Sequence, residues 1–371
     1  MSDLSDFLKW RGDLTFEQSP FNKLDAALLA HMSYNIFDDL VSEDFSHQIT
    51  LEELAKRFKQ TEDYEQRKTI GAMINDKTSS VFELTASTQR YKNVKICGYK
   101  IILSEEKEEQ FAAMTFVIGK LNVISIRGTD DSFIGWKEDF NLAYKDEIAS
   151  KKDALIYFEE AIKCLKGSFI FTGHSKGAHV AINTAVNCLP RYQKKIDAVF
   201  NFDGPGFHDY FYEKTEYKKI ENKIYSYYPG CSIVGMIFEH PKNYKIVKSD
   251  AVGINQHDPL NWQILGNDFI YEKDFQSESK FFYKAINDWA ARMDVELRER
   301  FVKAFFGVLD ASGCKTNLEL QKNLLKSSAK MLQKYSSYDK ETKSQIHKCT
   351  RVLKQAVIED LPMLRFFTNQ K

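Results

Sequence analysis

Ser168-Phe169-Ile170-Phe171-Thr172-Gly173-His174-Ser175-Lys176-Gly177 is the stretch of this sequence that decides the fold. Its first half is a short apolar run typical of a buried strand, and the segment from Ala178 to Asn187 behind it is helix-like. The last five residues have the spacing of a nucleophile elbow, a sharp turn from strand to helix. Gly173 and Gly177 leave room for a turn in which Ser175 takes unusual backbone angles and lifts its hydroxyl above the sheet edge. The pattern predicts a nucleophile at Ser175, and an ordinary turn with a solvent-facing serine is the alternative.

A second motif follows the preceding candidate strand, where Leu121 to Ile126 leads into Arg127-Gly128-Thr129. Attack of a serine on a carbonyl builds negative charge on oxygen. Hydrolases stabilise that charge with one donor just after the nucleophile and one from the loop after an earlier strand. The backbone N–H of Lys176 has the first position, and Thr129 has the second. Arg-Gly-Thr alone is equally typical of a plain strand-end turn, but its order and distance from the elbow favour an oxyanion hole.

The composition is that of a globular enzyme. The chain has 371 residues, 43% of them hydrophobic and 13% aromatic, which is enough for a sizeable core. Lys and Arg total 52 and Asp and Glu total 52, so no net charge recruits nucleic acid or an acidic membrane surface. No run approaches the ~18 apolar residues of a transmembrane segment. The first residues also lack the basic-then-apolar order of a signal peptide.

Cysteine and histidine patterns give no metal or disulfide framework. The six cysteines lie far apart without a Cys-x-x-Cys pair, which is typical of reduced thiols in a cytoplasmic protein. His208-Asp209 is the nearest approach to a metal pattern, but partners at ligand spacing are missing and a surface loop is the better interpretation. We therefore expect a cytoplasmic protein with no metal and no cofactor.

The pattern of apolar and polar residues changes twice along the sequence, which predicts three regions. Residues 1–90 form a helical N-terminal region that packs on the core, residues 91–275 form an α/β core, and residues 276–371 form a C-terminal helical region. In the core, strand-like runs alternate with helical segments, the pattern of a mostly parallel sheet covered on both faces. The predicted strands are Val94–Leu103, Phe111–Ile118, Val123–Ile126, Phe169–Phe171, Ala198–Phe202, Lys223–Tyr228 and Tyr244–Val247, and the predicted core helices are Ala154–Leu165 and Gly177–Cys188.

The two outer regions have helical periodicity. In the first, the expected helical stretches are Leu24–Leu40, Leu51–Phe58 and Ile70–Ile74. Near the other end, apolar side chains recur every three or four residues from Phe282 to Phe305, which predicts one long helix with an apolar face. Shorter helices are expected around Leu324 and Val357. Core packing is favoured over contact with an acyl chain for the long apolar face.

These motifs together resemble a known family. Strand, Arg-Gly-Thr, Trp136-x-x-Asp139 and then Gly-His-Ser-x-Gly is the order found in class 3 lipases and their α/β-hydrolase relatives. The chain is in particular similar to an uncharacterised bacterial branch of lipase-like proteins whose elbow reads Gly-His-Ser-Lys-Gly. Further segments of that branch are Leu24-Asp25-Ala26, Ser33-Tyr34, Asn201 to Phe207, Ser232 to Gly235, Glu239-His240 and Gln256 to Pro259. The resemblance covers about residues 20 to 265 and implies an α/β-hydrolase fold and a serine hydrolase activity.

A serine nucleophile needs a histidine base, which these folds place after the last strand, in the order serine, acid, histidine. His257 fits that order, since it follows the candidate strand at 244–247 and a loop. His240, which precedes that strand, is the rival. His174 adjoins the nucleophile but points elsewhere from a tight elbow, so a packing or hydrogen-bonding role is expected for it.

The acid departs from the lipase pattern. Lipases carry an Asp where this chain has Ser232. Asp203 is the favoured replacement because it directly follows the preceding strand, and a turn-capping role is the alternative for it. Glu239 and Asp258 are weaker candidates.

The expected function is serine-dependent cleavage of a carboxylic ester or thioester, in the manner of an esterase or lipase. Only about ten residues separate Asp139 from the helix near Lys151, so a long lid is absent and the outer helices are expected to cover the pocket. A small acyl ester or a single-chain lipid is therefore the expected substrate. The competing hypothesis is a catalytically impaired hydrolase-fold protein with a binding or interaction role. The oligomeric state is left open by the sequence.

Overall fold

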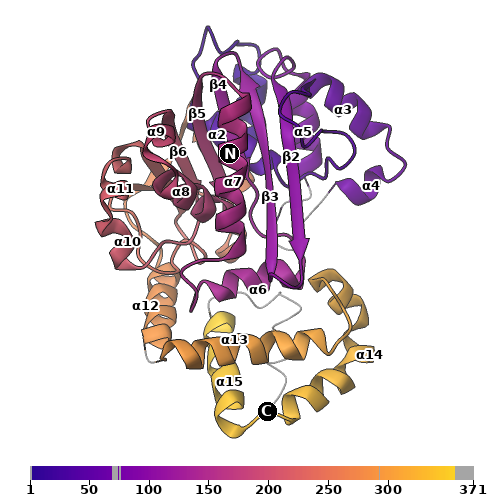
Figure 1. Cartoon of the computed structure of the whole chain (residues 1–371), viewed down its shortest axis with the longest axis vertical. Coiled ribbons are helices and arrows are strands. Elements are labelled where there is room, and N and C mark those ends of the chain that lie inside the picture. Colours follow the sequence, from indigo (N-terminus) through magenta and orange to yellow (C-terminus); the bar gives the residue numbers. More distant parts are fainter. Residues whose placement is uncertain (1, 69–73, 75–76, 292, 356–371) are drawn as a thin grey trace.

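A mixed sheet of nine strands organises the chain, whose computed structural model describes residues 2–68, 74, 77–291 and 293–355 (Figure 1). The strand order is β1-β2-β3-β4-β5-β6-β7-β8-β11. Strands β4 to β8 are parallel, and antiparallel strands extend the sheet at both sides. The bounds are β1 Ile49–Thr50, β2 Lys95–Ser104, β3 Glu109–Ile118, β4 Leu121–Ile126, β5 Ser168–His174, β6 Ile196–Phe202, β7 Ile224–Pro229, β8 Tyr244–Val247 and β11 Tyr271–Glu272, with a separate hairpin of β9 Ile264–Leu265 and β10 Asp268–Phe269.

The prediction of an α/β fold with a mostly parallel central sheet is confirmed. Each predicted strand is present, with ends within three residues of the expected ones. The short strands β1, β9, β10 and β11 were not predicted, because two residues are too few for a periodic pattern.

The consecutive order of the parallel strands places their connecting helices on one face of the sheet. Connections between neighbouring parallel strands are right-handed, so a sheet that grows in one direction receives every crossover on the same side. The buried Phe169 and Phe171 of β5 pack on this side in one cluster with Phe158 and Val180. The connecting helices are α6 Phe133–Asn141, α7 Ala149–Cys164, α8 Lys176–Asn187, α9 Pro190–Gln193, α10 Asp209–Glu213 and α11 Thr215–Lys218, with the short 3-10 turn Glu221–Lys223.

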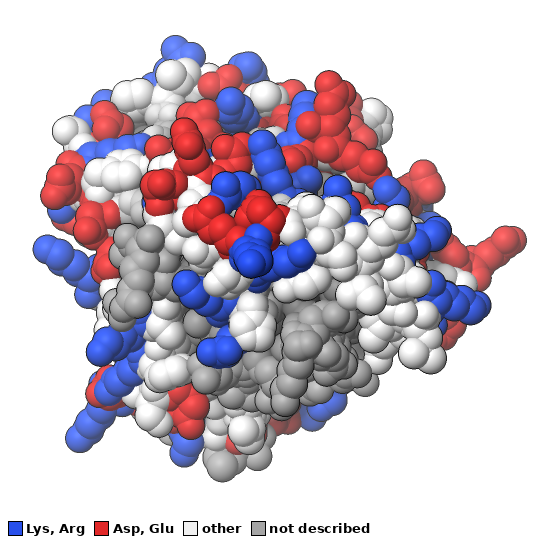
Figure 2. Space-filling view, turned by 90° about the horizontal axis from the view of Figure 1, so that it is seen from below, with Lys and Arg blue, Asp and Glu red and all other residues white. Residues whose placement is uncertain are grey.

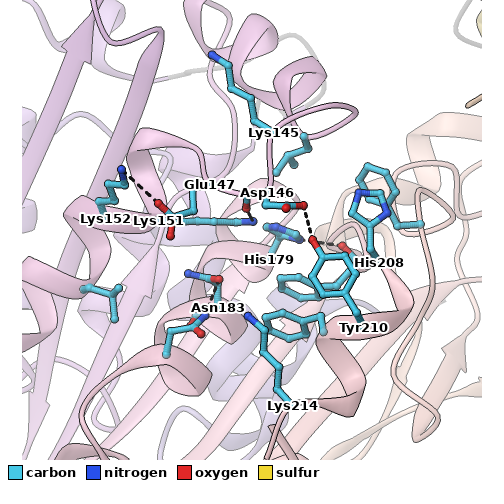
Figure 3. A pocket seen from close by; sticks show the side chains of 17 residues that line it. Lys145, Asp146, Glu147, Lys151, Lys152, His179, Asn183, His208, Tyr210 and Lys214 are labelled. Atoms are coloured by element: carbon cyan, nitrogen blue, oxygen red, sulfur yellow. Dashed lines mark hydrogen bonds and ion pairs between the residues drawn. The ribbon is translucent and has the colours of Figure 1, made fainter. Parts of the chain in front are cut away.

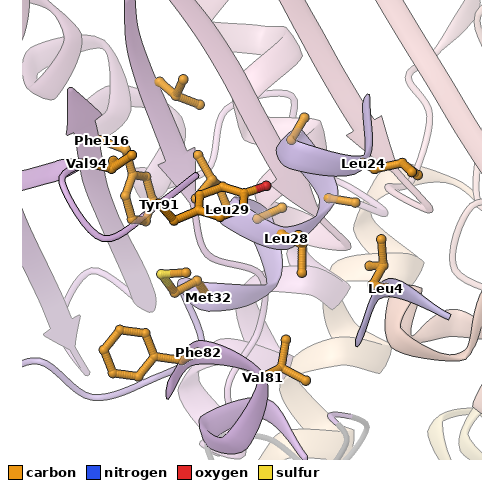
Figure 4. Packing of buried hydrophobic residues seen from close by; sticks show 14 of the residues in the cluster. Leu4, Leu24, Leu28, Leu29, Met32, Val81, Phe82, Tyr91, Val94 and Phe116 are labelled. Carbon is orange, nitrogen blue, oxygen red and sulfur yellow. The ribbon is translucent and has the colours of Figure 1, made fainter. Parts of the chain in front are cut away.

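The opposite face is covered by the N-terminal helices. Ile170, between the two phenylalanines of β5, belongs to a second cluster together with Leu28 and Leu29 (Figure 4). These helices complete a three-layer arrangement in which the sheet is buried on both sides. They are α1 Leu4–Arg11, α2 Lys23–Met32, α3 Leu51–Lys59, α4 Tyr64–Arg67 and α5 Thr78–Ser87.

The N-terminal predictions hold in part. The expected helix at 51–58 is confirmed as α3, but the helix expected to run from Leu24 to Leu40 ends at Met32. There the Ser33 hydroxyl donates to Ala30 O at 2.6 Å and the Asn35 amide donates to Met32 O at 3.0 Å, so side chains take over carbonyls of the last turn. The stretch predicted at 70–74 lies outside the described residues except for Ile74.

The central N-terminal helix α2 is buried on all sides, and its acidic residue is paired inside the protein. Asp25 accepts from Arg90 Nη2 at 2.6 Å and Nε at 2.7 Å, and it also accepts from the Tyr91 hydroxyl. Both members of the ion pair have exposures near zero, 1% for Arg90 and 0% for Asp25. This bidentate pair fixes α2 to the segment that leads into β2.

The C-terminal helices gather at one end of the sheet, against α6 (Figure 1). The prediction of one long helix from Phe282 to Phe305 is wrong, because α12 and α13 are separate and Asp294 caps α13 by accepting from Leu297 N at 2.8 Å. The helix around Leu324 is also longer than expected, at 20 residues, and Val357 lies outside the described residues. The helices are α12 Ser277–Ala291, α13 Val295–Asp310, α14 Asn317–Ser336 and α15 Lys340–Gln355. Basic and acidic side chains are interspersed on the face seen from this end (Figure 2).

The buried Asp25–Arg90 pair predicts a large effect of breaking it. Arg90→Met leaves a carboxylate buried without its partner, and we expect the free energy of unfolding to fall by about 3–5 kcal/mol. Arg57→Met is the matched control, because Arg57 pairs with Glu53 at 2.9 Å while 55% exposed, and its loss should cost under ~0.5 kcal/mol. Chemical denaturation of the three proteins measures both changes. Equal losses would contradict the anchoring role of Asp25.

Candidate active site

Ser175 lies in a strained turn between β5 and α8. Its backbone has φ +56° and ψ −135°, a region that non-glycine residues rarely occupy. The neighbouring glycines are sterically required: a Cβ at Gly173 would lie 2.5 Å from the carbonyl of Gly177, and one at Gly177 would lie 2.1 Å from Ile126 O. Such a conformation costs about 1–3 kcal/mol and persists only where the surroundings enforce it.

A carboxylate contacts the histidine that was predicted as the base. His257 Nδ1 lies 2.6 Å from Asp203 Oδ2, and both side chains are buried. Asp203 directly follows β6 and also has a positive φ, +50°, with its own N–H donating to Tyr227 O at 2.9 Å. Because a carboxylate accepts, the Nδ1 of the neutral ring carries the proton and Nε2 carries the lone pair.

Ser232, which stands where lipases have their acid, contacts the same carboxylate. Its hydroxyl donates to Asp203 Oδ1 at 2.5 Å, so both oxygens of Asp203 are engaged. The backbone of Gly235 packs tightly against this hydrogen bond. A Cβ at Gly235 would lie 2.5 Å from Asp203 Oδ1 and 2.6 Å from Ser232 Oγ. The segment after β7 therefore orients the carboxylate that it does not itself supply.

His174 joins the elbow to the loop of His257. Its Nε2 donates to the backbone oxygen of His257 at 2.9 Å, so its Nδ1 accepts from the Tyr34 hydroxyl at 2.8 Å. Burial holds the pKa of His174 well below its usual value, so the ring is neutral and this tautomer is the one that satisfies both contacts. The hydrogen-bonding role expected for His174 is thus seen, but its partners Tyr34 and His257 O are separated by too many residues for the sequence to reveal them.

The two expected oxyanion donors flank the elbow. Lys176 is the first residue of α8, and the first N–H groups of a helix have no intrahelical partner. The Thr129 hydroxyl donates to Asp139 Oδ2 at 2.5 Å, so this hydroxyl is already engaged with a carboxylate. A Cβ at Gly128 would lie 3.1 Å from Ser175 Cβ, so this loop packs directly on Ser175.

The side chains of Lys176 and Thr129 are held by buried hydrogen bonds and ion pairs with residues of α6 and β3. Lys176 Nζ is buried and donates to Glu138 Oε2 at 2.7 Å and to Gln110 O at 2.7 Å. Burial raises the pKa of Asp139 to about 6, and Thr129 holds its carboxylate. These contacts fix the turn at 127–129 against α6 and the start of α8.

The rival residues lie in other surroundings. His240 sits among aromatic rings, with Nε2 3.4 Å from Met236 Sδ, and burial lowers its pKa. The Glu239 carboxylate accepts from the Tyr283 hydroxyl at 2.7 Å. Asp258 accepts from Leu260 N at 2.8 Å and lies 3.5 Å from His31 Nδ1 on the N-terminal side of the sheet.

Two polar atoms of the candidate site remain available for a ligand. Among the described residues, neither Ser175 Oγ nor His257 Nε2 has a hydrogen-bond partner. No cluster of His, Cys, Asp and Glu with metal-binding geometry occurs in the part of the chain that the structure describes. The helices described there are also too short or too polar to cross a bilayer.

The parallel sheet, the strained serine at a strand-to-helix turn and the helix-covered faces define an α/β-hydrolase fold. The chain belongs to the Mbeg1-like family, a lipase-like family whose profile matches residues 85–307. No curated protein matches the sequence. Among solved structures, the crystal structure of M37 lipase aligns with a TM-score of 0.35 and 15% identity, over 58% of this chain and 70% of the lipase chain.

The backbone strain at Ser175 predicts that glycine is more stabilising than alanine at this position. Ser175→Gly relieves the positive φ whereas Ser175→Ala keeps it, so the glycine variant should be more stable by about 1 kcal/mol. Ser80, exposed in helix α5, is the matched control: there alanine should be more stable than glycine by about 1 kcal/mol. The free energies of unfolding of the four variants, measured by chemical denaturation, test whether the order of alanine and glycine is reversed at position 175. The same order at both positions would show that Ser175 is not strained.

Proposed function

We propose that this protein is a serine hydrolase that cleaves a carboxylic ester or thioester through an acyl-enzyme on Ser175. The observation that carries the proposal is the strained serine at the start of α8, with the buried Asp203–His257 pair attached to the next strand. Ser175 N donates to Phe202 O at 3.0 Å, and Phe202 precedes Asp203, so the nucleophile and the acid are joined through the backbone.

In the proposed reaction, His257 Nε2 takes the proton of Ser175 as its oxygen attacks the substrate carbonyl. The N–H groups of Lys176 and Thr129 stabilise the oxyanion, and Asp203 holds the imidazolium that forms. Collapse of the tetrahedral intermediate expels the alcohol or thiol, which receives the proton from His257. Water then attacks the acyl-enzyme by the same route, with His257 as base, and releases the acid and free Ser175.

The surroundings favour a small acyl ester or a single-chain lipid. The C-terminal helices are attached beside the oxyanion loop, where Phe133 N donates to Lys315 O at 2.8 Å and Asn317 N donates to Asp131 O at 3.1 Å. Phe133 and Met236 belong to one apolar cluster with Phe301 and Phe305 of α13. A cover built from whole helices suits an enclosed pocket better than a site that opens on a lipid surface.

We also propose a bacterial origin, a cytoplasmic location and a division of the chain into a core with two helical coverings. The elbow sequence supports membership of the bacterial lipase-like branch, and the free thiols of the six cysteines support a cytoplasmic location. We further propose that the helical regions 1–90 and 276–371 act as coverings of the α/β core at 91–275.

Covalent labelling tests the nucleophile. A fluorophosphonate probe should label the full-length protein, and Ser175→Ala should abolish labelling because the attacking oxygen is removed. Ser232→Ala is the matched control, a buried serine near the same carboxylate that should still permit labelling. Equal absence of labelling in the natural protein and in Ser175→Ala would favour the alternative, a hydrolase-fold protein with a binding role.

Turnover of a short-chain p-nitrophenyl ester tests the acid. Asp203→Asn changes the proton arrangement at His257 Nδ1, and we expect kcat to fall about 10⁴-fold. Ser232→Ala removes one contact to the carboxylate and should lower kcat by about tenfold, as loss of an orienting partner does. Glu239→Gln is the control and should leave turnover unchanged. Near-normal kcat in Asp203→Asn would mean that another group orients His257.

A further inference from the structure

A pocket with a volume of about 410 Å³ lies beside the proposed active site (Figure 3). It is bounded by α7, α8 and the segment from Gly206 to Lys214, and Ser175 is not among its lining residues. Two elements are nevertheless shared: His179 follows Ser175 by one turn of α8, and Gly206 follows Asp203 by three residues. The volume falls within the range of pockets that hold small ligands.

Lys151 brings a buried positive charge into this pocket. Only 7% of the residue is exposed, and its ammonium donates to Asp146 O at 2.8 Å. Within the described residues no carboxylate lies within ion-pairing distance of Lys151 Nζ. An ammonium has three donors, and a buried charge without a counter-ion is costly, so burial lowers the pKa of Lys151 to about 8. Asp146 and Glu147 act on the ammonium only from beyond ion-pairing distance, and its other close neighbour is the ring of Phe207, whose centroid lies 5.6 Å from Nζ.

His179 contributes a buried acceptor without a partner. Its Nδ1 lies 2.9 Å from Gly206 O, and because a carbonyl only accepts, Nδ1 carries the proton. Burial and then the nearby Lys151 hold the pKa of His179 well below its usual value, so Nε2 keeps its lone pair. Nε2 is buried and has no hydrogen-bond partner among the described residues. The ring is held in place by stacking on Phe207, with ring centroids 3.9 Å apart.

The other charged groups at the pocket have partners or lie at its rim. Lys152 pairs with Glu147 at 3.2 Å, and Lys145 pairs with Glu108 at 2.8 Å. The Asp146 carboxylate accepts from the Tyr210 hydroxyl. Lys214 lies 5.1 Å from the centroid of the Phe211 ring and adds a second cation at the edge. Figure 3 shows the Lys151 side chain reaching across the pocket toward Asp146 and His179.

We propose that this pocket binds inorganic phosphate. An oxyanion oxygen pairs with Lys151, and the P–OH that inorganic phosphate retains at neutral pH donates to His179 Nε2. Sulfate and carboxylate lack that proton at the same pH and would place a second lone pair against Nε2. The pairing of an ammonium with an imidazole acceptor therefore selects an anion that is also a hydrogen-bond donor. The inference is independent of any activity of Ser175.

Calorimetric titration with inorganic phosphate and with sulfate tests the site on the full-length protein at pH 7. We expect phosphate to bind at least about tenfold more tightly than sulfate, the factor that corresponds to one satisfied hydrogen bond. Lys151→Met should weaken phosphate binding by about tenfold or more. Lys152→Met makes the same charge change at the exposed rim and should alter it less than about twofold. Equal affinities for the two anions, or undiminished binding in Lys151→Met, would overturn the proposal.

A second variant separates recognition from folding. His179→Phe keeps a ring to stack on Phe207 and removes the acceptor, so the preference for phosphate over sulfate should disappear while the thermal unfolding midpoint, measured in parallel, shows that the chain is folded. Sedimentation with phosphatidylcholine vesicles containing phosphatidate distinguishes the source of the phosphate. Binding to those vesicles without binding of free phosphate would overturn the assignment to a small soluble ligand.

Discussion

The structure depends on one constraint, that a buried parallel sheet must be covered on both faces. Strands β4 to β8 lie in consecutive order, so right-handed connections deliver α7 and α8 to one face alone. If the N-terminal helices were removed, the apolar side chains of the other face would be exposed to water. Leu28 and Leu29 of α2 fill that layer, and the Asp25–Arg90 pair fixes the helix in place. The N-terminal region is therefore a structural layer of the core.

The same layer also reaches the proposed active site. Tyr34, just beyond α2, donates to His174, which in turn donates to the backbone of His257. His31 of α2 lies 3.5 Å from Asp258, the residue after His257. The loop of the proposed base is thus held from the face that the N-terminal helices cover, whereas its carboxylate partner comes from the end of β6. Buried polar groups stabilise when they have partners, and the two contacts of His174 limit the positions that the loop of His257 can take.

Much of the fold could be predicted from the sequence because the parallel strands are short apolar runs that alternate with helices. The elbow was visible since glycine is required at two fixed positions around Ser175. The break between α12 and α13 was missed because the apolar period continues across Asp294, and only the cap shows that the helix restarts. The contact of Ser232 with Asp203 was also beyond sequence reasoning. Twenty-nine residues separate them, and the interpretation of Ser232 as a lost acid concealed its role as a partner of the acid.

Helix α8 and the loop after β6 each contribute residues both to the proposed active site and to the pocket around Lys151. The helix carries Ser175 at its first turn and His179 at the next, while the loop carries Asp203 and then Gly206. An anion beside Lys151 would lie next to Gly206, which belongs to the same loop as Asp203. Any difference in ligand affinity between two positions of that loop must act equally in both directions, since coupling between binding sites is reciprocal.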